Sequence, residues 1–378
     1  MTPVSQKKKV PLLDLGALHK PIREEVLAAL TRVVDSNAFI MGDEVKQLEK
    51  SIAAYSRVPY AIGCASGSDA LVLALMAAGV RPGDAVLTTP FTFFATAGSI
   101  VRVGATPAFV DIDPATYNID PKALADAIRH TPRAKAVMPV HLYGACADMD
   151  PIMEIARSRG CAVIEDGAQS IGAEYKGMAA QSIGDIGCIS FFPSKNLGAM
   201  GDAGMVLTRD EAHARKLSAL RVHGAAKKYF HEWVGINSRL DSLQAAVLRV
   251  KLQHLDAETA GRNKNADRYR RNLSGAGLPI VLPQAAPYQT RHVYNQFVIR
   301  APRRDQLKAW LAENGVGTEI YYPLSLHQQV CFSELGYREG DFPESEKAAR
   351  EVLALPVHSA LTEEDLDYVC SQIRAFYA

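Results

Sequence analysis

Short runs of apolar residues alternate with longer segments of helical spacing between about residues 20 and 255. The segments 68–78, 94–103, 121–129 and 149–159 carry apolar residues at helical spacing and predict helices. Because strands that alternate with crossover helices form parallel sheets, the pattern predicts an α/β fold with a mostly parallel central sheet. The apolar runs that predict its strands are 60–64, 85–88, 106–110, 136–139, 162–165, 188–191 and 204–207.

The pattern changes near residue 256. A long polar helix is predicted over 257–273, and the final helix over 362–376 opens with a Thr-Glu-Glu-Asp start signal. Between them lie the apolar run 278–282, predicted strands over 295–299 and 318–322, and a predicted helix over 304–314. This mixture indicates a smaller α+β domain. We therefore expect two domains, 1–255 with the N-terminal segment and 256–378.

Composition and charge argue against a nucleic-acid binder and a membrane-spanning protein. The 378 residues include 42 Lys and Arg and 41 Asp and Glu, and the net charge of +1 does not fit a nucleic-acid binder. We interpret the basic run 7–9 as a solvated tail. The longest apolar run, 71–80, is about half the length that a membrane span needs. Because the six cysteines form no CxxC pair, we expect free, mostly buried thiols, no metal site and a cytoplasmic protein.

Polar or glycine-rich clusters follow several predicted strands, at 64–68, 110–113 and 165–169. In open α/β sheets, ligands bind beyond the carboxyl ends of the strands. The first cluster, Ser66-Gly67-Ser68, precedes a predicted helix. Its backbone N–H groups and the positive end of the helix dipole would suit a phosphate group. The alternative is a plain helix cap by Ser66 or Ser68.

Two further motifs contain ionisable groups at unusual places. Asp166 stands at the end of the buried run 162–165, directly after Glu165, where adjacent carboxylates would need a cationic partner. Lys195 follows another apolar run in a loop of Pro, Ser and Gly residues. Partial burial would lower its basicity and make it a nucleophile toward carbonyl groups. Taken singly, Asp166 could be a cap and Lys195 a solvated loop residue.

The three motifs have one explanation in common. Pyridoxal phosphate needs backbone donors for its phosphate, a carboxylate for its pyridine nitrogen and a lysine that forms a Schiff base with its aldehyde. The aromatic segment 91–94 offers a face that could stack on the ring. The sequence therefore predicts this cofactor.

With these motifs the chain resembles the DegT-like family of PLP-dependent sugar aminotransferases of fold type I. The resemblance runs from residue 10 to about residue 356. Relatives that dehydrate sugars have His where this chain has Lys195, so the resemblance favours transamination. The matching segments are 66–71, 91–93, 110–113, 165–170, 190–195, 201–204, 221–224, 235–241 and 321–323.

The resemblance implies a role for each matching residue. Lys195 would bond to the cofactor and move a proton, Asp166 would pair with the pyridine nitrogen, and Gln169 would lie near the ring oxygen. The other implied cofactor contacts are Gly67, Ser68 and Ser190 at the phosphate, Phe93 on the ring, and Asn237 from the neighbouring subunit of a homodimer with shared active sites. Residues expected on the sugar-nucleotide side are His223, Arg239, Tyr321 and His327.

The expected substrates are L-glutamate and a nucleotide-linked sugar. Segments 140–148 and 223–231 resemble relatives that aminate UDP-linked 3-oxo-uronates or TDP-linked 3-oxo-6-deoxyhexoses, which favours the 3-position. The product would be an amino sugar for polysaccharide or glycoside biosynthesis. Amination at the 4-position, a PLP-dependent sugar dehydratase and a non-catalytic PLP-binding regulator are the alternatives.

Overall fold

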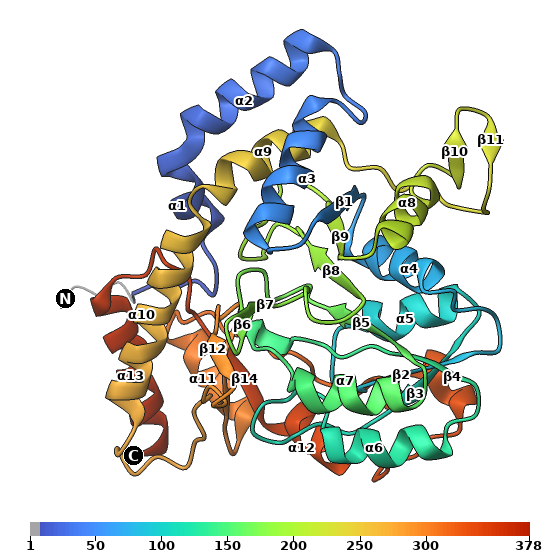
Figure 1. The fold of residues 1–378 in the computed structure, drawn as a ribbon. Helices are drawn as coiled ribbons and strands as arrows, with labels where there is room; N and C mark the ends of the chain where they lie inside the picture. Colours follow the sequence, from blue (N-terminus) through green and yellow to red (C-terminus); the bar gives the residue numbers. More distant parts are fainter. Residues whose placement is uncertain (1–7) are drawn as a thin grey trace.

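A seven-stranded sheet forms the centre of the computed structural model, which describes residues 8–378 (Figure 1). Its strand order is β1-β9-β8-β5-β4-β2-β3. The pairs from β3 to β8 are parallel, whereas β9 runs antiparallel to both β8 and β1. The strands are β1 (Tyr60–Cys64), β2 (Ala85–Thr88), β3 (Thr106–Phe109), β4 (Ala134–Val137), β5 (Ala162–Asp166), β8 (Ile186–Ser190) and β9 (Gly204–Thr208).

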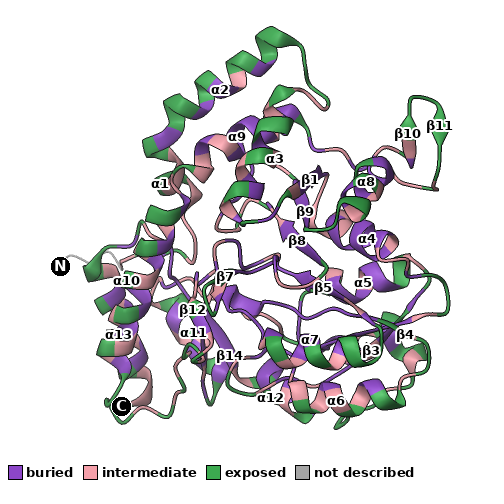
Figure 2. Cartoon of the chain, viewed as in Figure 1, coloured by how far each residue is buried: buried purple, intermediate pink, exposed green. Residues whose placement is uncertain are grey.

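Helices cover both faces of this sheet because its strands are apolar on both sides. Ile164 packs with α4 and α8, whereas its neighbour Val163 packs with α6 and α7 on the opposite face. Helices α3 and α9 cover the second face near β1 and β9. Figure 2 shows the strands as the buried layer. The helices are α3 (Asp43–Tyr55), α4 (Gly67–Ala77), α5 (Phe94–Arg102), α6 (Pro121–His130), α7 (Met149–Ser158), α8 (Glu211–Leu220) and α9 (Ser242–Leu252).

A second apolar core lies in the C-terminal part. Apart from Val10, all of its buried residues come from 266–373. Strands β13 (Phe297–Arg300) and β14 (Val352–Leu355) pair antiparallel between helices α10 (Leu255–Leu273), α11 (Arg304–Glu313), α12 (Pro343–Glu351) and α13 (Glu363–Tyr377). Helix α13 opens with the capping box that the sequence indicates, formed by Thr362 and Asp365. The division at residue 255 stays a prediction, and α10 begins there.

Short elements complete the chain. The N-terminal arm contains α1 (Leu15–His19) and α2 (Arg23–Ser36). A hairpin of β10 (Ala225–Lys227) and β11 (Phe230–His231) projects beside α8 (Figure 1). Strands β6 (Glu174–Tyr175), β7 (Met178–Ala179) and β12 (Gln289–Arg291) form a small sheet. Single 3-10 turns are η1 (Lys20–Ile22), η2 (Leu142–Gly144), η3 (Leu326–Gln328) and η4 (Val330–Leu335).

Several predictions from the sequence can be compared with these elements. The strands 60–64 and 85–88 are confirmed to the residue, whereas the predicted strand 136–139 lies two residues too late. The predicted strand 318–322 is wrong, because Glu319 makes one isolated bridge to Ala354 and no ladder. In the basic run, Lys7 lies outside the described residues, Lys8 pairs with Asp365 at 2.8 Å with 37% of its side chain exposed, and Lys9 is exposed.

The thiols and the helix lengths complete this comparison. Five of the six cysteines are buried and Cys331 is exposed, and all six are free thiols, as expected. No helix within residues 8–378 combines the length and apolarity that a membrane crossing requires.

Candidate active site

The side chains predicted to carry chemistry gather where β5 and β8 end. Asp166 is the last residue of β5 and Ser190 the last of β8. The two strands are parallel neighbours, with Asp166 opposite Cys188, so both ends lie at one edge of the sheet. The loop that carries Lys195 follows β8 directly. The topology therefore brings residues from distant parts of the sequence to one place.

Helix α4 begins next to the end of β8. Ser66 caps the helix by accepting a hydrogen bond of 3.1 Å from the N–H of Asp69, so the capping alternative is confirmed for Ser66. This cap uses the third N–H of the helix and leaves those of Gly67 and Ser68 for an anion. A Cβ on Gly67 would lie 2.5 Å from the Cβ of Ser190. Glycine thus allows the helix start to lie directly against Ser190, and the place where its free N–H groups meet the Ser190 hydroxyl is called the cradle.

Asp166 is almost fully buried, with 4% of its surface exposed. Thr96 of α5 donates a hydrogen bond of 2.7 Å to Oδ2, and the N–H of Ala168 donates one of 3.2 Å to Oδ1. Burial raises the pKa of Asp166, and these two donors together with Lys195 and His141 oppose the rise. The carboxylate is therefore held in a fixed orientation and keeps free lone pairs for a further cationic donor.

Glu165 has a different role from its neighbour. It is fully buried, and its Oε2 lies 2.7 Å from Nε2 of His141. The N–H of Ala147 donates to Nδ1 of the same ring, so Nε2 carries the proton that faces Glu165. The N–H groups of residues 181, 183 and 184 also donate to this carboxylate. His141 thus meets Glu165 as a hydrogen-bond donor with a neutral ring and not as the cationic partner expected from the sequence, and Glu165 holds the loop of residues 181–184.

Lys195 is half-buried in the loop after β8. Burial lowers the pKa of its amine from 10.5 to about 8, and the negative charge of Asp166 opposes part of that change. A lysine with this pKa is partly neutral near pH 8 and can act as a nucleophile or a base. Its loop is held by Lys251 of α9, which donates to the carbonyl of Gly198.

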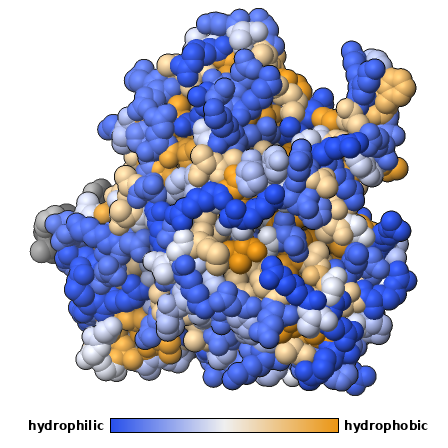
Figure 3. All heavy atoms as spheres, in the orientation of Figure 1, coloured by the Kyte–Doolittle hydropathy of each residue, from blue (hydrophilic) through white to orange (hydrophobic). Residues whose placement is uncertain are grey.

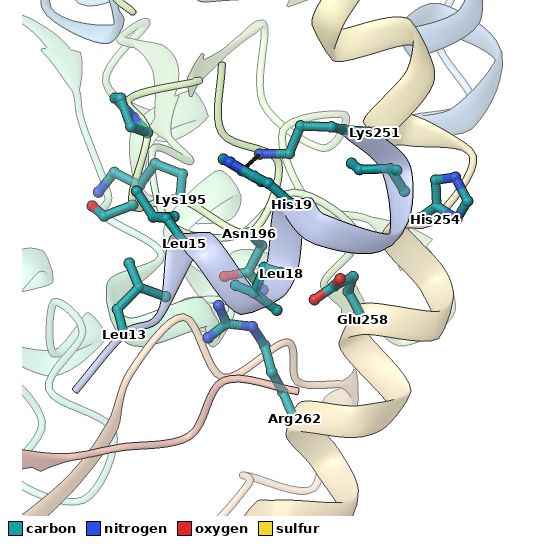
Figure 4. Close-up of a pocket in the computed structure, with 13 residues that line it drawn as sticks. Leu13, Leu15, Leu18, His19, Lys195, Asn196, Lys251, His254, Glu258 and Arg262 are labelled. Carbon is teal, nitrogen blue, oxygen red and sulfur yellow. Dashed lines mark hydrogen bonds between the residues drawn. The ribbon is translucent and has the colours of Figure 1, made fainter. Parts of the chain in front are cut away.

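A small cavity adjoins the loop that carries Lys195 (Figure 4). Leu13, Leu15 and Leu18 of the N-terminal arm line one side, and Arg262 reaches in from α10. Nε2 of His19 accepts a hydrogen bond of 3.1 Å from the ammonium of Lys251 in this cavity. The arm therefore packs directly against the segment that carries the reactive amine.

These features fit pyridoxal phosphate. The N–H groups of Gly67 and Ser68 lie beside the Ser190 hydroxyl and suit a phosphate, the buried Asp166 suits a cationic ring nitrogen, and Lys195 is a nucleophilic amine. Each of these three groups suits one end of this cofactor. Gln169, with 6% of its surface exposed, lies between the N–H of Tyr143 and the hydroxyl of Tyr322.

Phe93 is one of the more exposed large apolar side chains. Its exposed fraction is 57%, and its ring centroid lies 6.1 Å from that of Tyr322. An aromatic face in this position could be covered by a flat ring. Its contact with the cofactor stays a prediction.

Asn237, expected at the cofactor of the neighbouring subunit, and the four residues expected near the substrate are dispersed. Asn237 and His223 are exposed and Arg239 is half-buried, all on the segment that carries the β10–β11 hairpin. Among the described residues, no hydrogen bond or ion pair joins them to Lys195 or Asp166. Ser238, between two of them, accepts a hydrogen bond of 3.1 Å from the N–H of Ala65, next to the cradle.

The two remaining predicted residues lie in the C-terminal part. Tyr321 is half-buried, and its carbonyl accepts a hydrogen bond from the hydroxyl of Tyr143. His327 is buried, with Nε2 3.1 Å from Glu346 and its ring against Phe342. In this chain His327 is surrounded by protein, and its contact with a substrate stays a prediction.

Sequence reasoning did not assign a role to Thr96 or Tyr322. Each contacts a predicted cofactor residue through a hydrogen bond that spans 70 or more positions of the chain. No local pattern marks Thr96. Tyr322 lies in the segment 321–323 that carries the resemblance, which implies a role for Tyr321 and none for Tyr322.

Comparisons with known proteins agree with this arrangement. The model of the DegT/DnrJ/EryC1/StrS aminotransferase family matches residues 20–374. A protein of Geobacillus stearothermophilus named pleiotropic regulatory protein is 52% identical over 97% of this chain and 98% of its own length. The UDP-N-acetyl-3-dehydro-alpha-D-glucosamine 3-aminotransferase of Acidithiobacillus ferrooxidans is 45% identical over 98% of this chain and 99% of its own length.

Solved structures share the whole fold. The crystal structure of S. venezuelae DesV in complex with a ketimine intermediate has a TM-score of 0.94 and 39% identity, over 98% of each chain. The structure of ntda from Bacillus subtilis with bound cofactor PMP has a TM-score of 0.89 and 34% identity, over 97% of this chain and 84% of its own.

Proposed function

The chain belongs to the DegT/DnrJ/EryC1/StrS aminotransferase family, and we propose that it moves an amino group from L-glutamate to a nucleotide-linked 3-oxo sugar. It is a PLP-dependent aminotransferase. The observation that carries the reaction is the placement of the nucleophilic amine of Lys195 and the buried Asp166 at one edge of the sheet. The substrate class rests on the relative at 45% identity, which is named for a UDP-linked 3-dehydro sugar.

Each residue of the site has a separate role in such a transfer. Pyridoxal phosphate, when bound, supplies an electron-accepting ring and an aldehyde that carries the amino group between two half-reactions. Lys195 would hold the aldehyde end of the cofactor, and its amine would move the proton at the carbon that carries the amino group. Asp166 keeps the ring nitrogen protonated. The N–H groups of Gly67 and Ser68 and the hydroxyl of Ser190 hold the phosphate.

We also propose a homodimer whose sites are shared between subunits. Tyr229 and Phe230 of the hairpin are 81% and 66% exposed, and Val234, three residues after it, is 90% exposed. The hairpin at the upper right of Figure 3 places hydrophobic atoms beside hydrophilic ones on the surface. Large exposed apolar side chains of this kind are typical of a face that another protein covers. If subunits share sites, a dimer of one Asn237 variant and one Lys195 variant should regain activity at one of its two sites.

The proposal is tested first by the visible absorption spectrum of the purified protein. A cofactor band that changes on addition of L-glutamate, with release of 2-oxoglutarate, supports the donor and the first half-reaction. UDP- and TDP-linked 3-oxo sugars should then restore the original band. The Lys195→Ala variant should bind the cofactor without turnover, whereas Lys50→Ala, at an exposed lysine on α3, should behave as the wild type. Restoration by 4-oxo sugars alone would overturn the assignment to the 3-position.

A regulatory role is the second candidate, because the relative at 52% identity is named a pleiotropic regulatory protein. A regulator without turnover would bind the cofactor and leave its band unchanged when glutamate and every oxo sugar are supplied. The same spectra therefore separate the two candidates. The cytoplasmic location expected from the sequence and the pathway served by the product stay predictions.

A further inference from the structure

The orientation of the Gln169 amide is fixed by two neighbours. The backbone N–H of Tyr143 donates a hydrogen bond of 2.7 Å to its Oε1. An N–H can be accepted only by the carbonyl oxygen of an amide, so Nε2 must face the other way. There it donates a hydrogen bond of 3.1 Å to the hydroxyl of Tyr322. One amide hydrogen is used in this contact, and the second is left for another acceptor.

Tyr322 connects this amide to the C-terminal part of the chain. Its ring centroid lies 6.1 Å from that of Phe93 and 6.4 Å from that of Phe91. The preceding residue is tied to the same place, because the carbonyl of Tyr321 accepts a hydrogen bond from Tyr143. Tyr322 thus contacts two residues expected at the cofactor, Gln169 through its hydroxyl and Phe93 through its ring.

The hydroxyl keeps its proton under working conditions. Burial raises the pKa of Tyr322 above its usual value, and the negative charge of Asp166 raises it further. A neutral hydroxyl can accept from Gln169 and still donate elsewhere. Among the described residues it has one hydrogen-bond partner, the Gln169 amide.

We propose that Tyr322 is a positioning residue that holds the Gln169 amide with its second N–H toward the ring oxygen of the cofactor. The proposal rests on the predicted place of Gln169 at that oxygen. It makes the C-terminal part of the chain a contributor to the cofactor site, through one hydroxyl and one ring contact. Loss of the hydroxyl leaves the amide held only at its Oε1, by the N–H of Tyr143, while the aromatic ring stays in place.

The test is the Tyr322→Phe variant, which removes the hydroxyl and keeps the ring against Phe91 and Phe93. We expect its dissociation constant for pyridoxal phosphate, titrated into the cofactor-free protein, to rise about threefold to tenfold, the scale of one hydrogen bond. The pH midpoint of the bound cofactor band should shift as well. Tyr337→Phe is the matched control, because its hydroxyl accepts a bond from the N–H of Phe109 away from this site.

A double-mutant cycle separates positioning from general support of the fold. If Tyr322 acts through the amide, Tyr322→Phe should add little to Gln169→Leu in either measurement. Additive losses, or a wild-type band and dissociation constant in Tyr322→Phe, would overturn the inference. A wild-type protein that binds no cofactor would instead refute the proposed function, so the two failures are distinguishable.

Discussion

Replacing Lys195 by methionine should stabilise the cofactor-free protein near neutral pH. The amine is half-buried, and burial lowers its pKa from 10.5 to about 8 although Asp166 attracts the charge. At 1.36 kcal/mol per pH unit, this difference corresponds to about 3 kcal/mol. Methionine keeps an apolar stem of similar length without the charge. The reactive lysine is therefore held in its place at the expense of folding stability.

The direction of the pH dependence follows from proton binding. Between about pH 8 and 10.5 the unfolded chain holds the proton of Lys195 and the folded chain has lost it. Stability of the wild type therefore rises with pH across this range, and the penalty is present in full below about pH 8. The gain from Lys195→Met should be up to about 3 kcal/mol at pH 7 and should approach zero near pH 10.5.

The assay is urea unfolding of the cofactor-free proteins at pH 7 and pH 10, at one protein concentration. Lys50→Met on α3 serves as the control, because this lysine is exposed and its replacement should leave the unfolding free energy nearly unchanged at both pH values. A Lys195→Met protein that is less stable than the wild type at pH 7, or a gain independent of pH, would refute the reasoning.

Three further predictions concern the same site. Asp166→Asn should keep the fold and lower kcat at least about tenfold, measured as 2-oxoglutarate release, because an amide does not keep the ring nitrogen protonated. Gly67→Ala should weaken cofactor binding at least about tenfold in an equilibrium titration, since its Cβ would lie 2.5 Å from that of Ser190. Glu165→Gln should lower the urea-unfolding free energy by roughly 2–3 kcal/mol, because three backbone donors and His141 share its carboxylate.

The local pattern predicts the parts of the site that depend on neighbouring residues. Gly67 and Ser68 open an apolar helix, Asp166 ends an apolar run, and Lys195 follows another, so each lies where the sequence indicates. Strand positions are predicted for the same reason, since runs buried on both faces are apolar throughout. The antiparallel direction of β9 is not visible, because it depends on the return path of the chain.

Long-range contacts account for what the sequence does not reveal. Thr96 reaches Asp166 from 70 positions away, and Tyr322 reaches Gln169 from 153 positions away. A threonine on a helix and a tyrosine in a loop carry no signal of these partners. The strand expected at 318–322 is absent for a related reason, because β14 takes β13 as its ladder partner and leaves this segment a single bridge.

The pair Glu165–Asp166 helps to specify the register in which β5 pairs with its neighbours. Successive side chains of a strand point to opposite faces, so a slip by one residue would turn each acid to the other face. A slip in one direction would place the shorter aspartate at the N–H groups of residues 181, 183 and 184 that Glu165 reaches, and a slip in the other would place the longer glutamate against Thr96. A misaligned chain would lose both the contacts that hold the loop of residues 181–184 and the placement of Asp166. Two adjacent acids that differ by one methylene thus make the correct alignment of β5 more stable than one shifted by a single residue.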